Sequence, residues 1–163
     1  MDKVLAFLVL IAVIVLLGAG EIYFSLERRR VKASALMAKI RFDDWLAAVT
    51  DMTEACAADG AKIGELSRLL APGGSKDASV RAGAANRILS LAKQTLSEHT
   101  DSAEAVACAR RATDAWLAIA DLCDRYNHAA GDLNYGLGGK LTGRVGRLFR
   151  FEKMERLADL TLL

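Results

Sequence analysis

The chain has 163 residues, and its 22 lysines and arginines nearly balance its 20 aspartates and glutamates. A net charge of +2 is too small to indicate a nucleic-acid partner by itself. Abundant alanine, a single proline and the lack of β-branched runs outside the N-terminus predict an all-helical protein. Cys56, Cys108 and Cys123 lie far apart without a C-x-x-C pair, so the sequence suggests neither a disulfide framework nor a zinc site, and free thiols fit a reducing cytosol.

Residues 4–20 form an unbroken run of apolar or small side chains. As a helix this run covers ~25 Å, and its continuation through Ile22, Tyr23 and Phe24 reaches the ~30 Å thickness of a bilayer's hydrocarbon core. The rings at positions 23 and 24 would then lie at the membrane–water interface, where aromatic side chains are favoured. We therefore expect a transmembrane anchor that contacts the lipid bilayer from Val4 to Phe24.

A cleaved secretory signal is the alternative, because Lys3 gives a basic start and residues 18–20 are small enough for cleavage. The apolar run, however, exceeds the usual core of a signal, about 7–15 residues. Lys3 is the only basic side chain before the run, whereas six follow it: Arg28, Arg29, Arg30, Lys32, Lys39 and Arg41. Positive charge stays on the cytoplasmic side, so we expect a single-pass protein of the plasma (inner) membrane with its N-terminus outside and its helical bundle in the cytoplasm.

A three-four spacing of apolar residues follows the anchor and predicts that the helix continues out of the membrane to about Asp59-Gly60. The residues on this stripe are Ala35, Ala38, Phe42, Trp45, Val49, Met52 and Cys56. A short segment at 61–70 leads to the turn sequence APGGS at 71–75. Ser75 is a candidate N-cap for a second helix at about 76–98. Thr100 and Asp101 are alternative caps for a third helix, and Asp101 with Glu104 resembles a capping box.

The third helix has the strictest pattern and runs for about 36 residues until Gly136, Gly138 and Gly139 end it. Its stripe comprises Ala105, Ala109, Ala112, Trp116, Ile119, Cys123, Tyr126, Ala130, Leu133 and Leu137. Long helices of this kind, joined by short turns, pack antiparallel. We therefore predict an all-α fold, in which an N-terminal transmembrane helix precedes an antiparallel three- to four-helix bundle with long coiled-coil-like helices. Three such helices, starting at the membrane, would leave the end of the third ~50 Å from the bilayer.

The expected segments are an anchor at 1–24, a cytoplasmic bundle at 25–139 and a basic C-terminal segment at 140–163. A basic residue recurs at every third position of the last segment, each followed by an apolar one: Arg144, Arg147, Arg150, Lys153 and Arg156. A period of three drifts around a helix, so the segment is predicted to be either a short helix that wraps the bundle or an irregular arm. These five side chains are candidates for contact with an anionic surface.

Residues 125–135, RYNHAAGDLNY, resemble the pattern R-x-Y-N-x-A/V-V-x-D/E-Y-N at the end of the last long helix in the LemA family of membrane-anchored bacterial proteins. Tyr126, Asn127, Asp132 and Asn134 match, whereas Leu133 replaces the second tyrosine. The family's L-I-P-N-L-V segment, its Y-P-x-L-K-A element and its F-P after the Y-N repeats are missing. The resemblance implies a divergent member with a three- or four-helix bundle behind a single N-terminal anchor.

The tyrosines and asparagines of this stretch allow two interpretations. Asn127 and Asn134 lie seven residues apart, hence on one helical face, where paired amides fix the register of a bundle. Alternatively, Tyr126, Asn127, Asn134 and Tyr135 form a strip that binds a protein partner.

Motifs for catalysis are missing from the sequence. His99 and His128 have no second ligand-type residue at a metal-binding spacing, and no G-x-S-x-G or phosphate-binding glycine loop occurs. We therefore expect a non-enzymatic scaffold or adaptor that acts through helix–helix contacts with a protein partner or with itself, without cofactor, metal or small-molecule substrate. The alternative is a protein that tethers a membrane or, less in keeping with its charge, a nucleic acid through the basic C-terminal segment.

Overall fold

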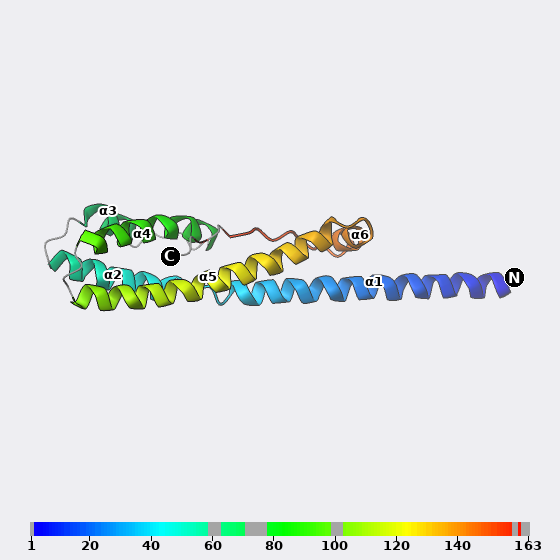
Figure 1. Ribbon diagram of the computed structural model, residues 1–163. Coiled ribbons are helices and arrows are strands. Elements are labelled where there is room, and N and C mark those ends of the chain that lie inside the picture. Colours follow the sequence, from blue (N-terminus) through cyan, green and yellow to red (C-terminus); the bar gives the residue numbers. More distant parts are fainter. Residues whose placement is uncertain (1, 59–62, 71–77, 99–102, 158–159, 161–163) are drawn as a thin grey trace. The chain divides into compact units, whose positions relative to one another are not determined.

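The computed structural model describes residues 2–58, 63–70, 78–98, 103–157 and 160, and within them every regular element is a helix (Figure 1). The all-helical prediction is therefore confirmed for the described part of the chain. The helices are α1 (Asp2–Met37), α2 (Asp43–Ala58), α3 (Gly64–Leu70), α4 (Ala78–Glu98), α5 (Ala103–Gly138) and α6 (Lys140–Leu148).

The chain divides into two compact units, each of which joins segments that lie far apart in the sequence. The terminal unit comprises Met1–Ala35 and Tyr126–Arg156, and the central unit comprises Leu36–Arg125 and Leu157–Leu163. The terminal unit thus contains most of α1, the last part of α5, all of α6 and residues 149–156. The central unit contains α2, α3, α4 and the first part of α5.

The prediction that the first helix runs unbroken from the anchor to residue 59 is wrong. Residues 38–42 separate α1 from α2, and the N–H groups of Lys39 and Ile40 each donate to the carbonyl three residues earlier, at 3.0 and 3.1 Å. The two aspartates in the first turn of α2 favour a helix start, because the N-terminal end of a helix dipole is positive. The break also lets the side chains of Ile40 and Phe42 both be buried.

Trp45 and Trp116 form the centre of the hydrophobic core of the central unit. Their ring centroids lie 4.8 Å apart, and both side chains are essentially inaccessible to solvent. Trp45 also contacts Phe42, with ring centroids 6.5 Å apart in an edge arrangement. The predicted stripe is buried from Phe42 onwards, whereas its first two members, Ala35 and Ala38, are exposed.

The predicted stripe of α5 is confirmed along nearly its whole length. Eight of its ten members are buried and the other two are half-buried, and the helix spans 36 residues as expected. The helix predicted at 76–98 corresponds to α4 at Ala78–Glu98. The turn at 71–75, the Ser75 cap, the helix end at Asp59-Gly60, His99 and the Thr100 and Asp101 caps lie outside the described residues.

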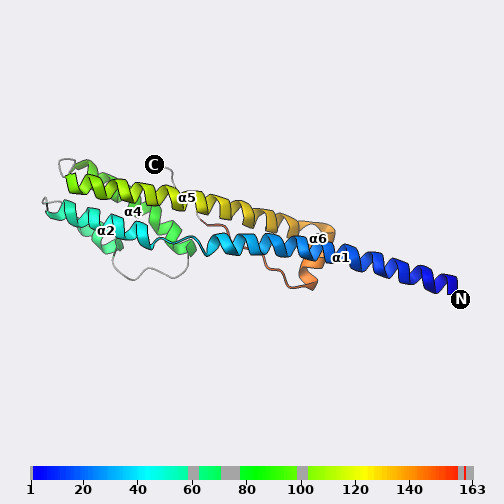
Figure 2. The same ribbon diagram turned by 90° about the horizontal axis from the view of Figure 1, so that it is seen from below.

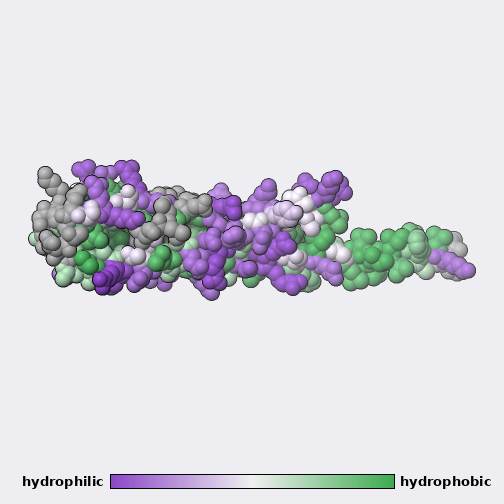
Figure 3. All heavy atoms as spheres, viewed as in Figure 1, coloured by the Kyte–Doolittle hydropathy of each residue, from purple (hydrophilic) through white to green (hydrophobic). Residues whose placement is uncertain are grey.

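Among the described helices, α1 alone is long and apolar enough to cross a membrane. Every large apolar side chain from Val4 to Leu17 is exposed, with exposed fractions between 42% and 71%. Figure 3 shows this part of α1 as an uninterrupted hydrophobic surface. An apolar patch of this size is typical of an interaction with a membrane or another protein.

Candidate functional site

In the terminal unit, the end of α5 packs against α1 just after the apolar run. The Arg29 guanidinium donates a 2.8 Å hydrogen bond to the carbonyl oxygen of Asp132, and Leu26 is buried. A Cβ placed on Gly136 would lie 3.1 Å from the Leu26 side chain, so the two helices are in close contact there. In Figures 1 and 2 this part of α5 runs alongside α1.

The prediction that the third long helix ends far from the apolar run is therefore wrong. α5 ends beside Ile22, Leu26 and Arg29, at the end of the apolar run. The prediction assumed three helices of full length that alternate in direction. It did not count the short segment at 61–70 as a helix, but α3 lies there, and one added helix in an alternating series reverses the direction of the last one.

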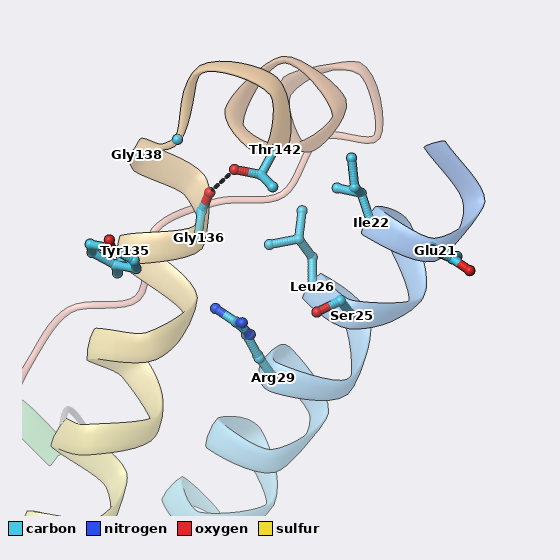
Figure 4. Close-up of a pocket in the computed structure, with 10 residues that line it drawn as sticks. Glu21, Ile22, Ser25, Leu26, Arg29, Tyr135, Gly136, Gly138 and Thr142 are labelled. Carbon is cyan, nitrogen blue, oxygen red and sulfur yellow. Dashed lines mark hydrogen bonds between the residues drawn. The ribbon is translucent and has the colours of Figure 1, made fainter. Parts of the chain in front are cut away.

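Two glycines allow α6 to lie directly against the end of α5. Gly143 and Gly146 are both buried, and a Cβ on Gly143 would overlap the carbonyl oxygen of Leu137. A Cβ on Gly146 would lie 2.5 Å from the Leu137 side chain and 3.6 Å from that of Leu26. The Thr142 hydroxyl donates to the carbonyl of Gly136, as Figure 4 shows, and so fixes the start of α6.

A left-handed residue ends α6 and turns the chain back towards α1. Arg150 has φ 55°, and its N–H donates to the Arg147 carbonyl at 3.2 Å. The N–H of Phe151 donates to the Gly146 carbonyl at 2.9 Å. These two bonds define a Schellman motif, whose left-handed position is usually glycine. The basic residue at position 150 is thus a structural terminator as well as a surface charge.

Aromatic rings join this turn to α1. The ring centroid of Tyr23 lies 4.8 Å from that of Phe149 and 5.6 Å from that of Phe151. The Arg30 guanidinium lies 5.7 Å from the centre of the Phe151 ring and pairs with Glu27 at 2.6 Å. Tyr23, expected at the membrane–water interface, therefore also packs against the turn after α6.

Residues 149–156, the C-terminal arm, are held to α5 by side chains of the motif that resembles the LemA family. The Asn134 amide donates to the Met154 carbonyl at 2.8 Å and accepts from the Met154 N–H at 2.9 Å. The Tyr126 hydroxyl donates to the carbonyl of Glu155 at 2.7 Å. Burial raises the pKa of the Tyr126 phenol, and the nearby Glu155 carboxylate raises it further. The phenol therefore stays protonated.

The four residues predicted as a partner-binding strip do not form one exposed surface. Tyr126 and Asn127 are buried, Asn134 is half-buried and engaged with the arm, and Tyr135 is 86% exposed. The alternative interpretation, in which paired amides fix the register of the helices, fits Asn134 in part. Its amide is paired, but with the backbone of the chain's own arm. A role in binding another protein stays a prediction, and Tyr135 is the one member whose whole side chain is available for it.

An open groove of about 740 Å³ lies between α1 and the α5–α6 junction (Figure 4). Its α1 wall includes Glu21, Ile22 and Arg29, and Tyr135 and Thr142 contribute to the opposite wall. Among the described residues, histidine, cysteine and carboxylate side chains form no cluster that could bind a metal ion. The groove offers a mixed polar and apolar surface rather than a closed catalytic pocket.

The five basic residues predicted for an anionic surface are all exposed, but they lie on two kinds of structure. Arg144 and Arg147 belong to α6, whereas Arg150, Lys153 and Arg156 belong to the arm. Both alternatives for this segment are thus partly confirmed, because it begins as a short helix and continues as an irregular arm.

No known protein family, curated protein or solved structure matches this chain. The resemblance to the LemA family therefore depends on the motif in α5.

Replacing Asn134 by alanine is expected to release the arm. The change leaves the N–H and carbonyl of Met154 without their partners, at a cost of about 1–3 kcal/mol. Amide hydrogen exchange should therefore become faster at Met154 and Glu155. Tyr135→Ala serves as the control, because that side chain is exposed, and unchanged exchange in Asn134→Ala would contradict the assigned bonds.

The Cys123 thiol is expected to resist alkylation. It is buried, and desolvation raises its pKa from 9.0 to about 11. The thiolate fraction near neutral pH is therefore lowered about 100-fold. Folding favours the protonated thiol, so this contribution to stability is complete below the pKa of the unfolded chain and is lost as the pH rises through about 11.

Peptide-resolved iodoacetamide labelling tests this expectation. The rate at Cys123 should keep rising with pH until about 11, whereas a thiol introduced by Ser34→Cys on the exposed face of α1 should level off near the ordinary value. The same dependence of the labelling rate on pH at both thiols would contradict the burial of Cys123.

Proposed function

We propose that this chain is a LemA-like single-pass membrane protein that acts as a non-catalytic scaffold. α1 anchors it in a bacterial plasma membrane with the N-terminus outside, and the helices that follow bind a protein partner, or a second copy, in the cytoplasm. The observation that carries the proposal is the direct continuity between the apolar run and the packed part of the terminal unit.

Under this proposal, the continuity of α1 holds a binding surface at a fixed distance from the bilayer. α1 extends without a break from Asp2 to Met37, so no flexible linker follows the apolar run. Leu26 and Arg29 attach α5 to the same helix within about one and a half turns of Phe24. A partner that contacts this region would be held next to the membrane.

The open groove beside Tyr135 is the best-supported contact surface. Exposed aromatic side chains are enriched at protein interfaces, and Tyr135 makes no hydrogen bond within the described chain. Arg29 provides a positive charge on the opposite wall of the groove, whereas the Glu21 carboxylate points away from α5 (Figure 4). Such a surface suits a helix of a partner that carries both apolar and charged side chains.

Site-specific crosslinking from native membranes tests this proposal. A photoreactive amino acid replaces Tyr135, and a second chain carries it at Leu117, which is 47% exposed in the central unit. We expect a discrete crosslinked product from position 135. Arg29→Gln should weaken this product, whereas an excess of unlabelled Tyr135→Ala chain should leave it unchanged because it does not compete for the partner. Products of equal yield at both positions, or none at 135, would contradict the proposed surface.

A further inference from the structure

We propose that α6 is an interfacial helix that lies on the same bilayer leaflet from which α1 emerges and binds anionic lipid headgroups. The inference depends on the proposed span of α1 and assigns a second membrane contact to the terminal unit. The position of α6, its exposed apolar face and its positive charge each support this contact independently.

The position of α6 puts it level with the end of the apolar run. Phe149, directly after α6, contacts Tyr23, and Gly146 lies against Leu26. α6 also runs across α1 rather than along it: it is seen nearly end-on in Figure 1 and crosses α1 in Figure 2. A helix that crosses a membrane-spanning helix at this level lies in the plane of the interface.

The exposed apolar face of α6 is directed towards the span. Gly143 and Gly146 face Leu137 at the end of α5, which approaches the apolar run from the opposite direction. Leu141 and Leu148 stand two positions from these glycines, and thus on the opposite side of the helix. They are 66% and 75% exposed, and neighbouring Phe149 is 49% exposed. The chain itself leaves these large apolar side chains uncovered on the side of the bilayer.

The charge of the segment fits an anionic surface. Residues 133–151 contain no aspartate or glutamate, but they contain four exposed basic residues: Lys140, Arg144, Arg147 and Arg150. None of the four side chains has an ion-pair partner among the described residues. Basic residues beside an exposed apolar stripe are typical of helices that lie in the interface of anionic membranes. Such charges act over ~8–10 Å, and attachment beside the span holds this segment close to the proposed headgroup layer.

A fluorescent probe at position 148 tests the inference in the full chain. Leu148→Cys and the control Ser34→Cys are labelled under native conditions, in which the buried native thiols do not react. Each chain is reconstituted into vesicles of phosphatidylcholine alone or mixed with phosphatidylglycerol. Quenching by lipids with a nitroxide on the headgroup, and by aqueous iodide, reports where the probe lies.

We expect strong lipid quenching and weak iodide quenching at position 148, and the reverse at position 34. Spin-labelled phosphatidylglycerol should quench the probe at 148 more than spin-labelled phosphatidylcholine. The double variant Arg144→Gln/Arg147→Gln should remove this preference, because each arginine contributes up to about fivefold to it. High salt should remove it as well.

Three outcomes separate the claims. Equal iodide quenching at 148 and 34 in floating vesicles would overturn the interfacial position of α6 while leaving the span intact. Lipid contact without preference for phosphatidylglycerol would overturn the recognition of anionic headgroups. A chain that does not float with the vesicles at all would contradict the span itself, and with it the proposed function.

Discussion

Gly143→Ala is expected to displace α6 from the end of α5. The added methyl group would overlap the carbonyl oxygen of Leu137, which belongs to helix backbone and cannot rotate away as a side chain can. Overpacking of this kind costs about 1–3 kcal/mol, and more where backbone must move. Hydrogen exchange in α6 and in the arm should become faster, because the turn after α6 depends on the same placement.

Gly138→Ala is the matched control, since a Cβ at this position meets no atom within 4 Å. It should leave exchange in α6 unchanged and stabilise the end of α5 slightly, because alanine loses less backbone entropy than glycine. If amide exchange in α6 of Gly143→Ala were as slow as in the wild type, the close approach of α6 to Leu137 would be contradicted.

Trp116→Ala is expected to give the largest loss of stability. The side chain is completely buried and packs against Trp45 at 4.8 Å, so truncation leaves a large cavity in the central unit. Changes of this kind cost about 3–5 kcal/mol. Chemical denaturation of the full chain in detergent, followed by circular dichroism, should show a lower midpoint for the loss of helix.

Leu117→Ala, one position further along α5, is the control because its side chain is 47% exposed. Its midpoint should stay close to that of the wild type, as expected for a surface position. Similar midpoints for both variants would mean that the two tryptophans do not form the core of the central unit.

Periodic burial explains why α5 could be predicted from the sequence. Its apolar residues follow a single three-four spacing, and a helix is the only regular element that places such residues on one face. The break after Met37 could not be predicted in the same way, because Ala35 and Ala38 continue the spacing although neither is buried. Tertiary packing of Ile40 and Phe42 outweighs the local pattern there.

The site was predictable in its residues but not in their partners. The motif identified Tyr126 and Asn134 as important, yet both bind backbone groups of the arm, and backbone groups leave no signature in a sequence. The close approach of α6 depends on Gly143 and Gly146, whose role becomes visible only next to Leu137. The miscounted direction of α5 likewise placed the basic segment far from the membrane, whereas it lies beside the end of the apolar run.

Extraction of native membranes with alkaline carbonate tests the central claim most directly, using the full chain detected by an antibody against its C-terminal part. We expect the protein to remain in the membrane pellet, because the exposed apolar run of α1 is long and apolar enough to span the bilayer. Release into the supernatant would contradict the anchor. It would instead favour a cleaved signal or a helix whose apolar face is covered by another protein.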